Sequence, residues 1–524
     1  MKNHARLAAA VLVAPFVVSA ALGACSSDGG SSSGGSSGSS GGAEAGVIQG
    51  GPPPPAVTGS GEQAKVTVAG PAAPVHLVQG TSVEIEVSIT RGGSTGGVQV
   101  SIADLPAKVI ATAETIPVGM TTAKLKLVAE SSADQIVARP KIVATAVGTT
   151  VRAEAPFDFV VRGPAGSIDT TFGTGGRVPF AATAILRGVY ATKDGKLLAW
   201  GGDGTDPVLA RYIPDGALDA TFGTAGKYKR SNTLGPGPTV YEAATQLADG
   251  RLMLLTTRGS GPSGYRPVLT RLGVDGAYDT GFGEQTLTTT VGFGTSFRKD
   301  ASGRTAVVFL NGQQFMRLLE IDGTPATNAQ IGCGEELSGG ALALASTTEG
   351  YCYMPVAPGP VERRTLATGA AVATSADLPF DMGYDVSYPG RTVLVAGGRV
   401  YVAGMVGASA AIVAHKPNDL ALDTTFGTNG RADSFAGSRL LFAIPGPSGA
   451  VVVAGHTASG TVLARHLADG TLDPGFGAAG VVTLPTDGQT GLELRGITTM
   501  ADGRVVVAIA SQDQNQGRLL RIWP

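Results

Sequence analysis

The chain has 524 residues, which is enough for two or three domains with sizeable hydrophobic cores. Glycine accounts for 78 residues and charged residues for only 15%, and short apolar runs alternate with Gly and Pro, a pattern typical of an all-β chain. The net charge of −2, without a cluster of Lys and Arg, excludes the electrostatic pattern of a nucleic-acid-binding protein.

Residues 1–24 have the pattern of a signal peptide. A basic start precedes a mostly apolar run over 7–22, which is shorter than the about 20 residues that a membrane span needs. The run ends in Leu-Gly-Ala-Cys at 22–25, which resembles the lipobox of bacterial lipoproteins. The resemblance implies a thioether-linked lipid on Cys25, cleavage before it, and acylation of the new amino group, for example by palmitate. An ordinary secretory signal with an incidental cysteine is the alternative.

Residues 25–63 form the expected linker between this lipid and the folded chain. A tract of Ser and Gly, interrupted only by Asp28, cannot bury apolar surface and is expected to be flexible, and the prolines at 52–55 stiffen its end. Ser26 follows the lipidated cysteine, and by resemblance to bacterial lipoproteins this favours the outer membrane. We therefore expect a protein of the cell envelope that faces the periplasm or the cell surface.

Residues 64–162 are predicted to form an immunoglobulin-like β-sandwich. Apolar and polar residues alternate with period two over 83–89 and 123–127, and a third strand is expected at 157–161. About 100 residues with several short strands fit such a sandwich, without its usual cysteine pair. The Asp-Leu-Pro-Ala sequence at 104–107 resembles bacterial Ig-like modules of surface proteins, which are more often spacers than binding sites.

A hairpin repeats seven times over the rest of the chain. In each copy a glycine-containing turn precedes an apolar strand, and the intervals are close to 50 residues, the length of one propeller blade. The seven turn glycines are Gly195, Gly250, Gly303, Gly350, Gly398, Gly449 and Gly503. The sequence therefore predicts that residues 163–524 form a seven-bladed β-propeller, and the fold class of the whole chain is all-β.

A second motif, Asp-x-x-Phe-Gly, lies between the hairpins. Its Asp and Phe residues are Asp169 and Phe172, Asp219 and Phe222, Asp279 and Phe282, Asp423 and Phe426, and Asp473 and Phe476. Both motifs recur in phase, and together they resemble the delta-60 repeats of bacterial surface propellers. The Asp-x-x-Phe-Gly element is missing around 324–334 and 370–382, where blade geometry is least certain.

These repeated residues are expected to be structural. The Asp carboxylate most simply accepts hydrogen bonds from backbone N–H groups two or three residues on, and the Phe is buried between neighbouring blades. An alternative makes the five Asp residues calcium ligands, although calcium prefers six to eight oxygens and each motif offers one carboxylate. A further set recurs four residues before a turn and is expected to donate to carbonyls of a neighbouring blade; it comprises Arg211, Arg271, Arg364 and Arg465, with His415 in the matching place of another blade.

The two remaining cysteines, Cys333 and Cys352, are expected to form a disulfide within the fourth blade. Disulfides persist in exported proteins, and closing so short a loop is worth about 3 kcal/mol. Two separate buried thiols are the alternative.

The two ends of the repeat region are expected to share one blade. Residues 177–180 supply a strand before the first hairpin, whereas 518–523 is the third strand after the last hairpin and no fourth follows. Pairing of these two segments would leave no blade short and no edge open.

The sequence contains no motif that assigns a chemical reaction. We find no nucleophile elbow in a suitable context, no Walker loop and no zinc-ligand spacing, so we expect no metal and no cofactor. The leading hypothesis is a lipid-anchored protein that binds an envelope protein or glycan or serves as a scaffold, with the membrane as its other partner. A polysaccharide hydrolase or lyase and a purely structural adhesion element are the alternatives.

Overall fold

The computed structural model describes residues 65–93, 96–181, 185–230, 241–259, 264–288, 292–311, 313–333, 341–353, 359–378, 380, 392–437, 441–489, 491–511 and 516–524. The expected signal peptide, Cys25 and the 25–63 linker lie outside these residues. Within the described part the chain is nearly all-β, with one short 3-10 helix, η2 (Pro447–Gly449). None of the helices found there is long and apolar enough to cross a membrane.

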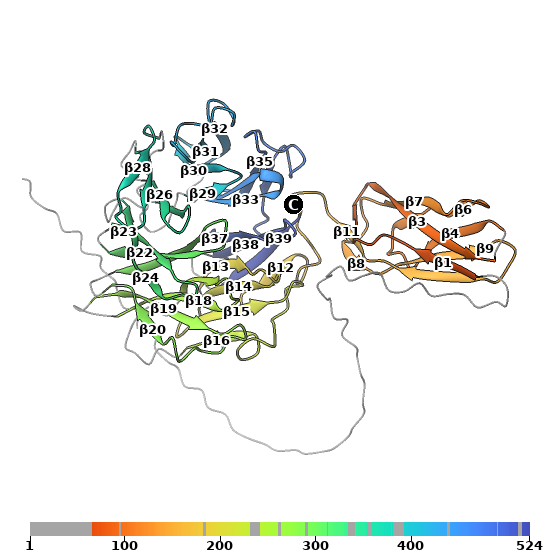
Figure 1. The fold of residues 1–524 in the computed structure, drawn as a ribbon, viewed down its shortest axis with the longest axis horizontal. Coiled ribbons are helices and arrows are strands. Elements are labelled where there is room, and N and C mark those ends of the chain that lie inside the picture. Colours follow the sequence, from red (N-terminus) through yellow and green to blue (C-terminus); the bar gives the residue numbers. More distant parts are fainter. Residues whose placement is uncertain are drawn as a thin grey trace, which may run out of the picture. The chain divides into compact units, whose positions relative to one another are not determined.

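The first eleven strands pair only with one another (Figure 1). They are β1 (Lys65–Ala69), β2 (Val75–Val78), β3 (Ser82–Gly92), β4 (Val98–Ala103), β5 (Val109–Ala111), β6 (Glu114–Ile116), β7 (Thr122–Ala129), β8 (Ile136–Ala138), β9 (Lys141–Ala146), β10 (Arg152–Pro156) and β11 (Phe159–Arg162). The sheet orders are β1-β3-β7-β5, β10-β9-β4-β6 and β2-β11-β8.

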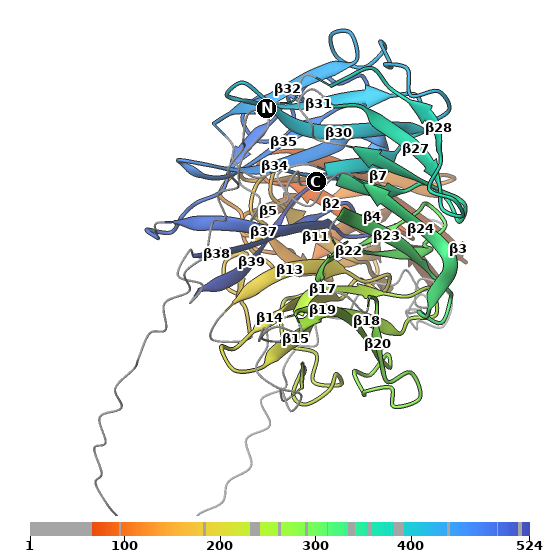
Figure 2. The ribbon, with the colours of Figure 1, turned by 90° about the vertical axis from the view of Figure 1, so that its left-hand side faces the viewer.

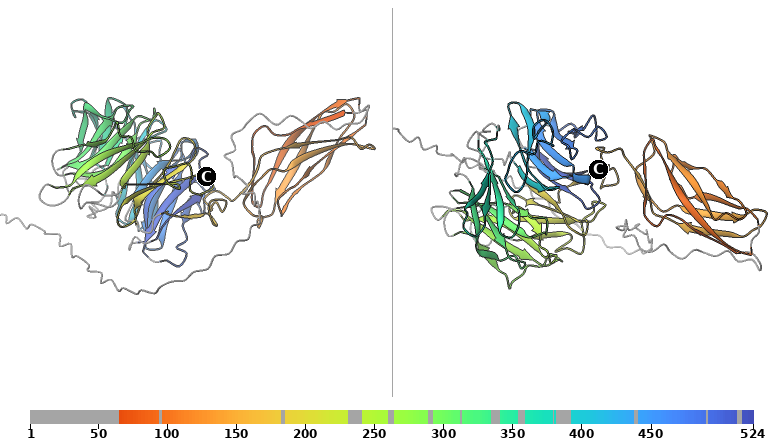
Figure 3. Two further views of the ribbon diagram at one scale, coloured as in Figure 1. Left: turned by 90° about the horizontal axis from the view of Figure 1, so that it is seen from below. Right: turned by 45° about the horizontal axis from the view of Figure 1, so that its top comes forward.

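A single hydrophobic core lies between these sheets, which are stacked in layers (Figure 3). In β3, Ile85, Val87 and Ile89 are buried while Glu86 and Ser88 between them are exposed, so the period-two prediction is confirmed for this strand. The third predicted strand begins at Phe159, two residues later than expected, and it pairs in parallel with β2.

The remaining strands form seven four-stranded antiparallel sheets. Three of them contain β13 (Leu186–Ala191), β14 (Leu197–Gly202), β15 (Pro207–Tyr212) and β16 (Lys227–Lys229); β17 (Tyr241–Gln246), β18 (Leu252–Arg258), β19 (Arg266–Leu272) and β20 (Glu284–Thr286); and β21 (Phe293–Lys299), β22 (Thr305–Asn311), β23 (Gln313–Leu319) and β24 (Pro325–Cys333).

Four further sheets complete the set. They contain β25 (Ala341–Leu344), β26 (Glu349–Tyr353), β27 (Val361–Thr365) and β28 (Ala371–Thr374); β29 (Thr392–Ala396), β30 (Arg399–Val406), β31 (Ser409–His415) and β32 (Arg431–Ala436); β33 (Leu441–Pro445), β34 (Val451–Thr457), β35 (Gly460–His466) and β36 (Val481–Thr483); and β12 (Arg177–Pro179), β39 (Gly517–Ile522), β38 (Val505–Ser511) and β37 (Leu492–Thr499).

The sheets follow one another in a ring in chain order, from yellow through green and cyan to blue (Figure 2). The strands β13, β17, β21, β25, β29 and β33, which come first in their sheets, each contact the next one in this series. In the last sheet β37 takes this place and contacts both β33 and β13, so these seven strands are the innermost ones. The middle strands, such as Leu197–Gly202, are buried on both faces because neighbouring sheets cover them. This is why they appear in the sequence as continuous apolar runs and not as alternating ones.

Six of the seven predicted turn glycines have the positive φ that such turns need: Gly195, Gly250, Gly303, Gly398, Gly449 and Gly503. The prediction is wrong for Gly350. This residue lies inside β26, where it pairs with Leu344 and Arg364, and the turn precedes it. Its hairpin lacks the Asp-Gly pair or equivalent that marks most of the other turns.

One sheet is built from both ends of the repeat region. β12 pairs with β39 in antiparallel register, so that Arg177 lies opposite Leu520 and Pro179 opposite Arg518. This is the pairing that the strand count predicted. It covers the edge of β39 with backbone hydrogen bonds, and Leu519, Leu520 and Ile522 are fully buried.

Candidate functional site

The Asp-x-x-Phe-Gly motif forms a shared set of contacts wherever it occurs, in which the Asp accepts a hydrogen bond from an arginine that also lies over the Phe ring, and we call this set the latch. In the β13–β16 sheet, Asp219 Oδ1 accepts hydrogen bonds from the backbone N–H and the hydroxyl of Thr221, at 3.1 and 2.6 Å. Its Oδ2 accepts from Arg211 Nε and Lys196 Nζ, each at 2.8 Å. The Arg211 guanidinium lies over the Phe222 ring, 4.4 Å from its centroid.

The other four latches repeat this geometry with small changes. The Asp–Arg pairs are Asp169 with Arg521 (2.7 Å), Asp279 with Arg271 (2.8 Å), Asp423 with Arg399 (2.6 Å) and Asp473 with Arg465 (2.8 Å). Arg399 comes from the start of β30, because His415 occupies the usual arginine position on β31. The sequence had not identified Arg399 as a member of the set.

Each latch also reaches the next sheet of the ring. Arg211 Nη1 donates to the Val274 carbonyl and Arg521 Nη1 to the Pro214 carbonyl. The backbone N–H of Gly223, which follows Phe222, donates to the Asp275 carbonyl at 2.7 Å. The latch therefore combines a buried ion pair, a cation–π contact and hydrogen bonds between sheets.

The latch carboxylates are occupied by the protein's own donors. Burial alone would raise the pKa of Asp219, but hydrogen bonds from Lys196 and Thr221 and the charge of Arg211 outweigh it and hold this pKa well below its usual value. A calcium ion at Asp219 would lie beside two cations, so the contacts favour the structural interpretation over the metal site. Among the described residues, no group of three or more His, Cys, Asp and Glu side chains is placed to hold a metal.

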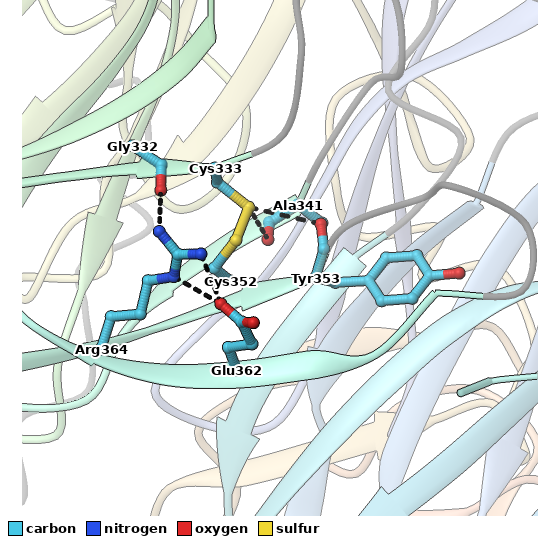
Figure 4. The surroundings of a disulfide bond; sticks show 7 residues. All are labelled: Gly332, Cys333, Ala341, Cys352, Tyr353, Glu362 and Arg364. Atoms are coloured by element: carbon cyan, nitrogen blue, oxygen red, sulfur yellow. Dashed lines mark hydrogen bonds and ion pairs between the residues drawn. A yellow bond between two sulfur atoms is a disulfide. The ribbon is translucent and has the colours of Figure 1, made fainter. Parts of the chain in front are cut away.

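Cys333 and Cys352 form a disulfide, with their Cα atoms 5.6 Å apart (Figure 4). The expectation that both lie in the fourth blade is wrong: Cys333 ends β24 of the third sheet, and Cys352 lies on β26 of the fourth. Without an Asp-x-x-Phe-Gly element the chain continues as a long strand up to Cys333. Arg364 adds a hydrogen bond from the fourth sheet to the Gly332 carbonyl of the third, at 3.1 Å.

The sequence did not reveal a second feature, which lies on the innermost strands. β37, β13, β17 and β21 belong to four consecutive sheets, and each carries a β-bulge where it pairs with its second strand. The extra residues in these bulges are Arg495, Arg187, Glu242 and Thr295. A bulge re-aims its side chain relative to the regular alternation of the strand. The described residues of β25, β29 and β33 pair without a bulge.

We call Arg187, Glu242, Glu493 and Arg495 the inner cluster. Gly188 and Gly496, which follow the two arginines, lie so close that a Cβ on Gly496 would be 3.2 Å from Gly188 Cα. Trp200 Nε1 donates to the Glu242 carbonyl at 3.0 Å and fixes the third bulge against the second. The signal for these bulges was the Leu-Arg-Gly sequence shared by 186–188 and 494–496.

The members of the inner cluster are not equally neutralised. Arg495 forms an ion pair with Glu493, at 2.9 Å. Burial raises the pKa of Glu242, and the charge of Arg187 only partly offsets this effect. Within the described residues, the Arg187 guanidinium forms neither an ion pair nor a hydrogen bond, and its Nε is buried.

A different basic group on the innermost strands is already satisfied. Lys299, at the end of β21, donates to the Tyr190 hydroxyl at 2.7 Å and to the Gln246 carbonyl. Burial and the nearby Lys193 charge lower the pKa of Lys299 to about 8. Lys299 thus holds three sheets together, whereas Arg187 has no such role.

The comparisons with known proteins support the propeller. Residues 192–222 and 446–476 match the family model described as "Domain of unknown function (DUF5122) beta-propeller". Each matched segment ends on a latch phenylalanine, Phe222 or Phe476, and so covers one hairpin and the Asp-x-x-Phe motif that follows it. No curated protein matches the chain.

Similarity to solved structures is low. A protein of unknown function from Bacteroides caccae is 10% identical, with a TM-score of 0.33 over 55% of this chain and 97% of that one. Prolyl oligopeptidase B from Galerina marginata is 9% identical, with a TM-score of 0.37, and the match covers 63% of this chain and 47% of the enzyme. The fold assignment therefore depends on the family match and the antiparallel sheets: this is a nearly all-β protein that contains a β-propeller.

Proposed function

We propose that this protein is a lipid-anchored binding protein of the bacterial cell envelope. In this proposal the seven sheets are the blades of one delta-60-type propeller, strands β1–β11 are an Ig-like spacer, and Cys25 carries the lipid. The protein would stand at the outer membrane and present the propeller to an envelope glycan or protein.

The inner cluster is the observation that supports binding over a purely structural role. Bulges and charged side chains are costly on innermost strands, and Arg187 has no stabilising partner among the described residues. By contrast, the charged residues that hold the ring together are paired in the latches. A purely structural role would not require the partly buried Arg187 guanidinium, which has no partner among the described residues.

Two measurements test this proposal. Metabolic labelling with an alkyne fatty acid should mark the wild-type protein and not Cys25→Ser, which should also leave the membrane fraction. The purified full-length protein, in detergent, should co-sediment saturably with isolated envelope polysaccharide. Absence of labelling would contradict the anchor, and absence of saturable co-sedimentation would contradict binding.

A further inference from the structure

The inner cluster has the chemistry of a specific binding site. Arg187 and Arg495 lie on neighbouring sheets whose backbones touch at Gly188 and Gly496. Glu493 neutralises Arg495, at 2.9 Å, so the two arginines differ in what they can offer a ligand. Arg187 has a full fork of donors without an acceptor among the described residues.

An oxyanion is the group that this fork fits. A guanidinium that has lost part of its hydration recovers the lost free energy through charge-assisted hydrogen bonds to a carboxylate or phosphate. The planar fork binds a carboxylate through two parallel bonds, which adds direction to the attraction.

Glu242 supplies the complementary group. No described residue donates a hydrogen bond to its carboxylate, although its backbone is held by Trp200. The charge of Arg187 lowers the pKa of this carboxylate, although the two side chains form no ion pair. A ligand that bridges the two must therefore carry an acceptor for Arg187 and a donor, such as a hydroxyl, for Glu242.

The charge balance limits the ligand further. Two arginines and two glutamates give the inner cluster no net charge, so it has no excess positive charge to hold a dianion. A dianion such as phosphate would also be repelled by the Glu242 carboxylate. A single carboxylate surrounded by hydroxyl groups meets no such repulsion.

We propose that Arg187 and Glu242 form a binding site for an acidic sugar, with the sugar carboxylate on Arg187 and a ring hydroxyl on Glu242. This inference rests on the proposed binding function and names the class of its ligand. The bulges in β13 and β17 then serve to turn these two side chains toward the ligand.

Calorimetry on the full-length protein in detergent tests the site with three probes: sodium D-glucuronate, D-glucose and inorganic phosphate. Wild-type protein should bind glucuronate at least tenfold more tightly than either of the others. Arg187→Gln should weaken glucuronate binding at least tenfold, the size expected for a charge-assisted hydrogen bond. Arg431→Gln removes an arginine paired with Asp433 on the outer strand β32 and should leave binding unchanged.

Glu242→Gln gives an independent readout. It should weaken glucuronate binding and tighten phosphate binding, because it removes the repelling charge. If the melting temperature shows that Arg187→Gln does not fold, Arg187→Lys keeps the charge without the fork and should still lose affinity. Equal binding of glucuronate by Arg187→Gln and wild type, or a glucuronate affinity no better than that for glucose, would overturn the inference. If envelope polysaccharide still co-sediments in that case, only the acidic-sugar site fails and the binding function stands.

Discussion

Neighbouring sheets of the ring are joined in two different ways. Five junctions use a latch, in which an Asp–Arg ion pair and a phenylalanine help to link one sheet to the next. The two junctions on either side of the β25–β28 sheet lack the motif. One of them uses the Cys333–Cys352 disulfide and the other uses Phe380, which packs on Tyr353 of one sheet and against Gly404 of the next.

The comparison shows that the ring needs a closed junction between every two sheets, and that the contact which closes it can differ. A ring of separate sheets is only as stable as its weakest junction, because one open junction exposes the cores on both of its sides. A latch can be copied together with the repeat, because its groups come from the motif itself and from the neighbouring sheet. Where the motif is absent, a covalent bond joins one pair of sheets, and Phe380 with a hydrogen bond from the Tyr351 hydroxyl to the Pro417 carbonyl joins the other.

The largest effect is expected from breaking the most buried latch. Asp169 is fully buried and neutralises both Arg521 and Arg504. Asp169→Asn should lower the free energy of unfolding by about 3–5 kcal/mol, because it leaves the buried Arg521 guanidinium without a countercharge, whereas Arg504 keeps Asp502. Asp473→Asn is the matched control, since Arg465 is the one described residue that forms an ion pair with Asp473, which is also more exposed. Urea denaturation that ranks the two variants equally would contradict this.

The disulfide junction provides the second test. Replacing Cys333 and Cys352 together by serine should cost about 3 kcal/mol, the value for a loop of this length. Hydrogen exchange should increase first in β24 and β26, on the two sides of the junction, while the latch junctions stay protected. Uniformly faster exchange around the ring would instead mean that the junctions are not independent.

A pair of glycines separates backbone strain from packing in the latch. Gly276 (φ 83°) lies over the preceding latch, where an added Cβ would be 2.6 Å from the Phe222 ring, whereas Gly195 (φ 77°) has nothing within 4 Å. Gly195→Ala should cost about 1–2 kcal/mol for its positive φ. Gly276→Ala should cost more, and thermal denaturation measures the difference. Equal losses of stability would show that the Phe222 ring can move aside without any cost in free energy.

The smallest effect concerns acid stability. The hydroxyl of Thr425 and the charge of Arg399 hold the pKa of Asp423 at about 2, below its ordinary value of 3.8. Because the folded state lowers this pKa, the stabilisation is complete above the unfolded value and is lost as the pH falls toward 2. Thr425→Val should raise the pKa of Asp423 in a carbon-13 NMR titration. Thr471→Val, which alters the neighbourhood of Asp469, is the control and should leave Asp423 unchanged.

Features encoded within one repeat could be predicted from the sequence. The Asp and Phe residues of the latches are identified by a short motif with fixed spacing, and the pairing of β12 with β39 follows from counting strands. The errors fall where the motif is lost. The sequence predicts a turn at Gly350 and places Cys333 in the fourth sheet, and both predictions are wrong because neither position has an Asp-Gly or Asp-x-x-Phe-Gly element to set its register.

The inner cluster could not be predicted in the same way. A bulge depends on which residue of one strand faces which residue of the next, and the sequence of a single strand does not specify this. The proximity of Arg187 to Glu242 also depends on two residues from different repeats. The shared Leu-Arg-Gly at 186–188 and 494–496 marks two bulges, but nothing comparable marks Glu242.

The pairing of Asp169 with Arg521 has a consequence for the order of folding. These residues are 352 positions apart, so the ion pair and the β12–β39 ladder beside it can form only after nearly the whole repeat region has been synthesised. Closing so long a loop costs entropy that no local contact repays. The individual hairpins can assemble early, but the ring remains an open arc with exposed apolar strands until β39 arrives. The chain therefore depends on staying soluble until that last strand has been made and has paired with β12.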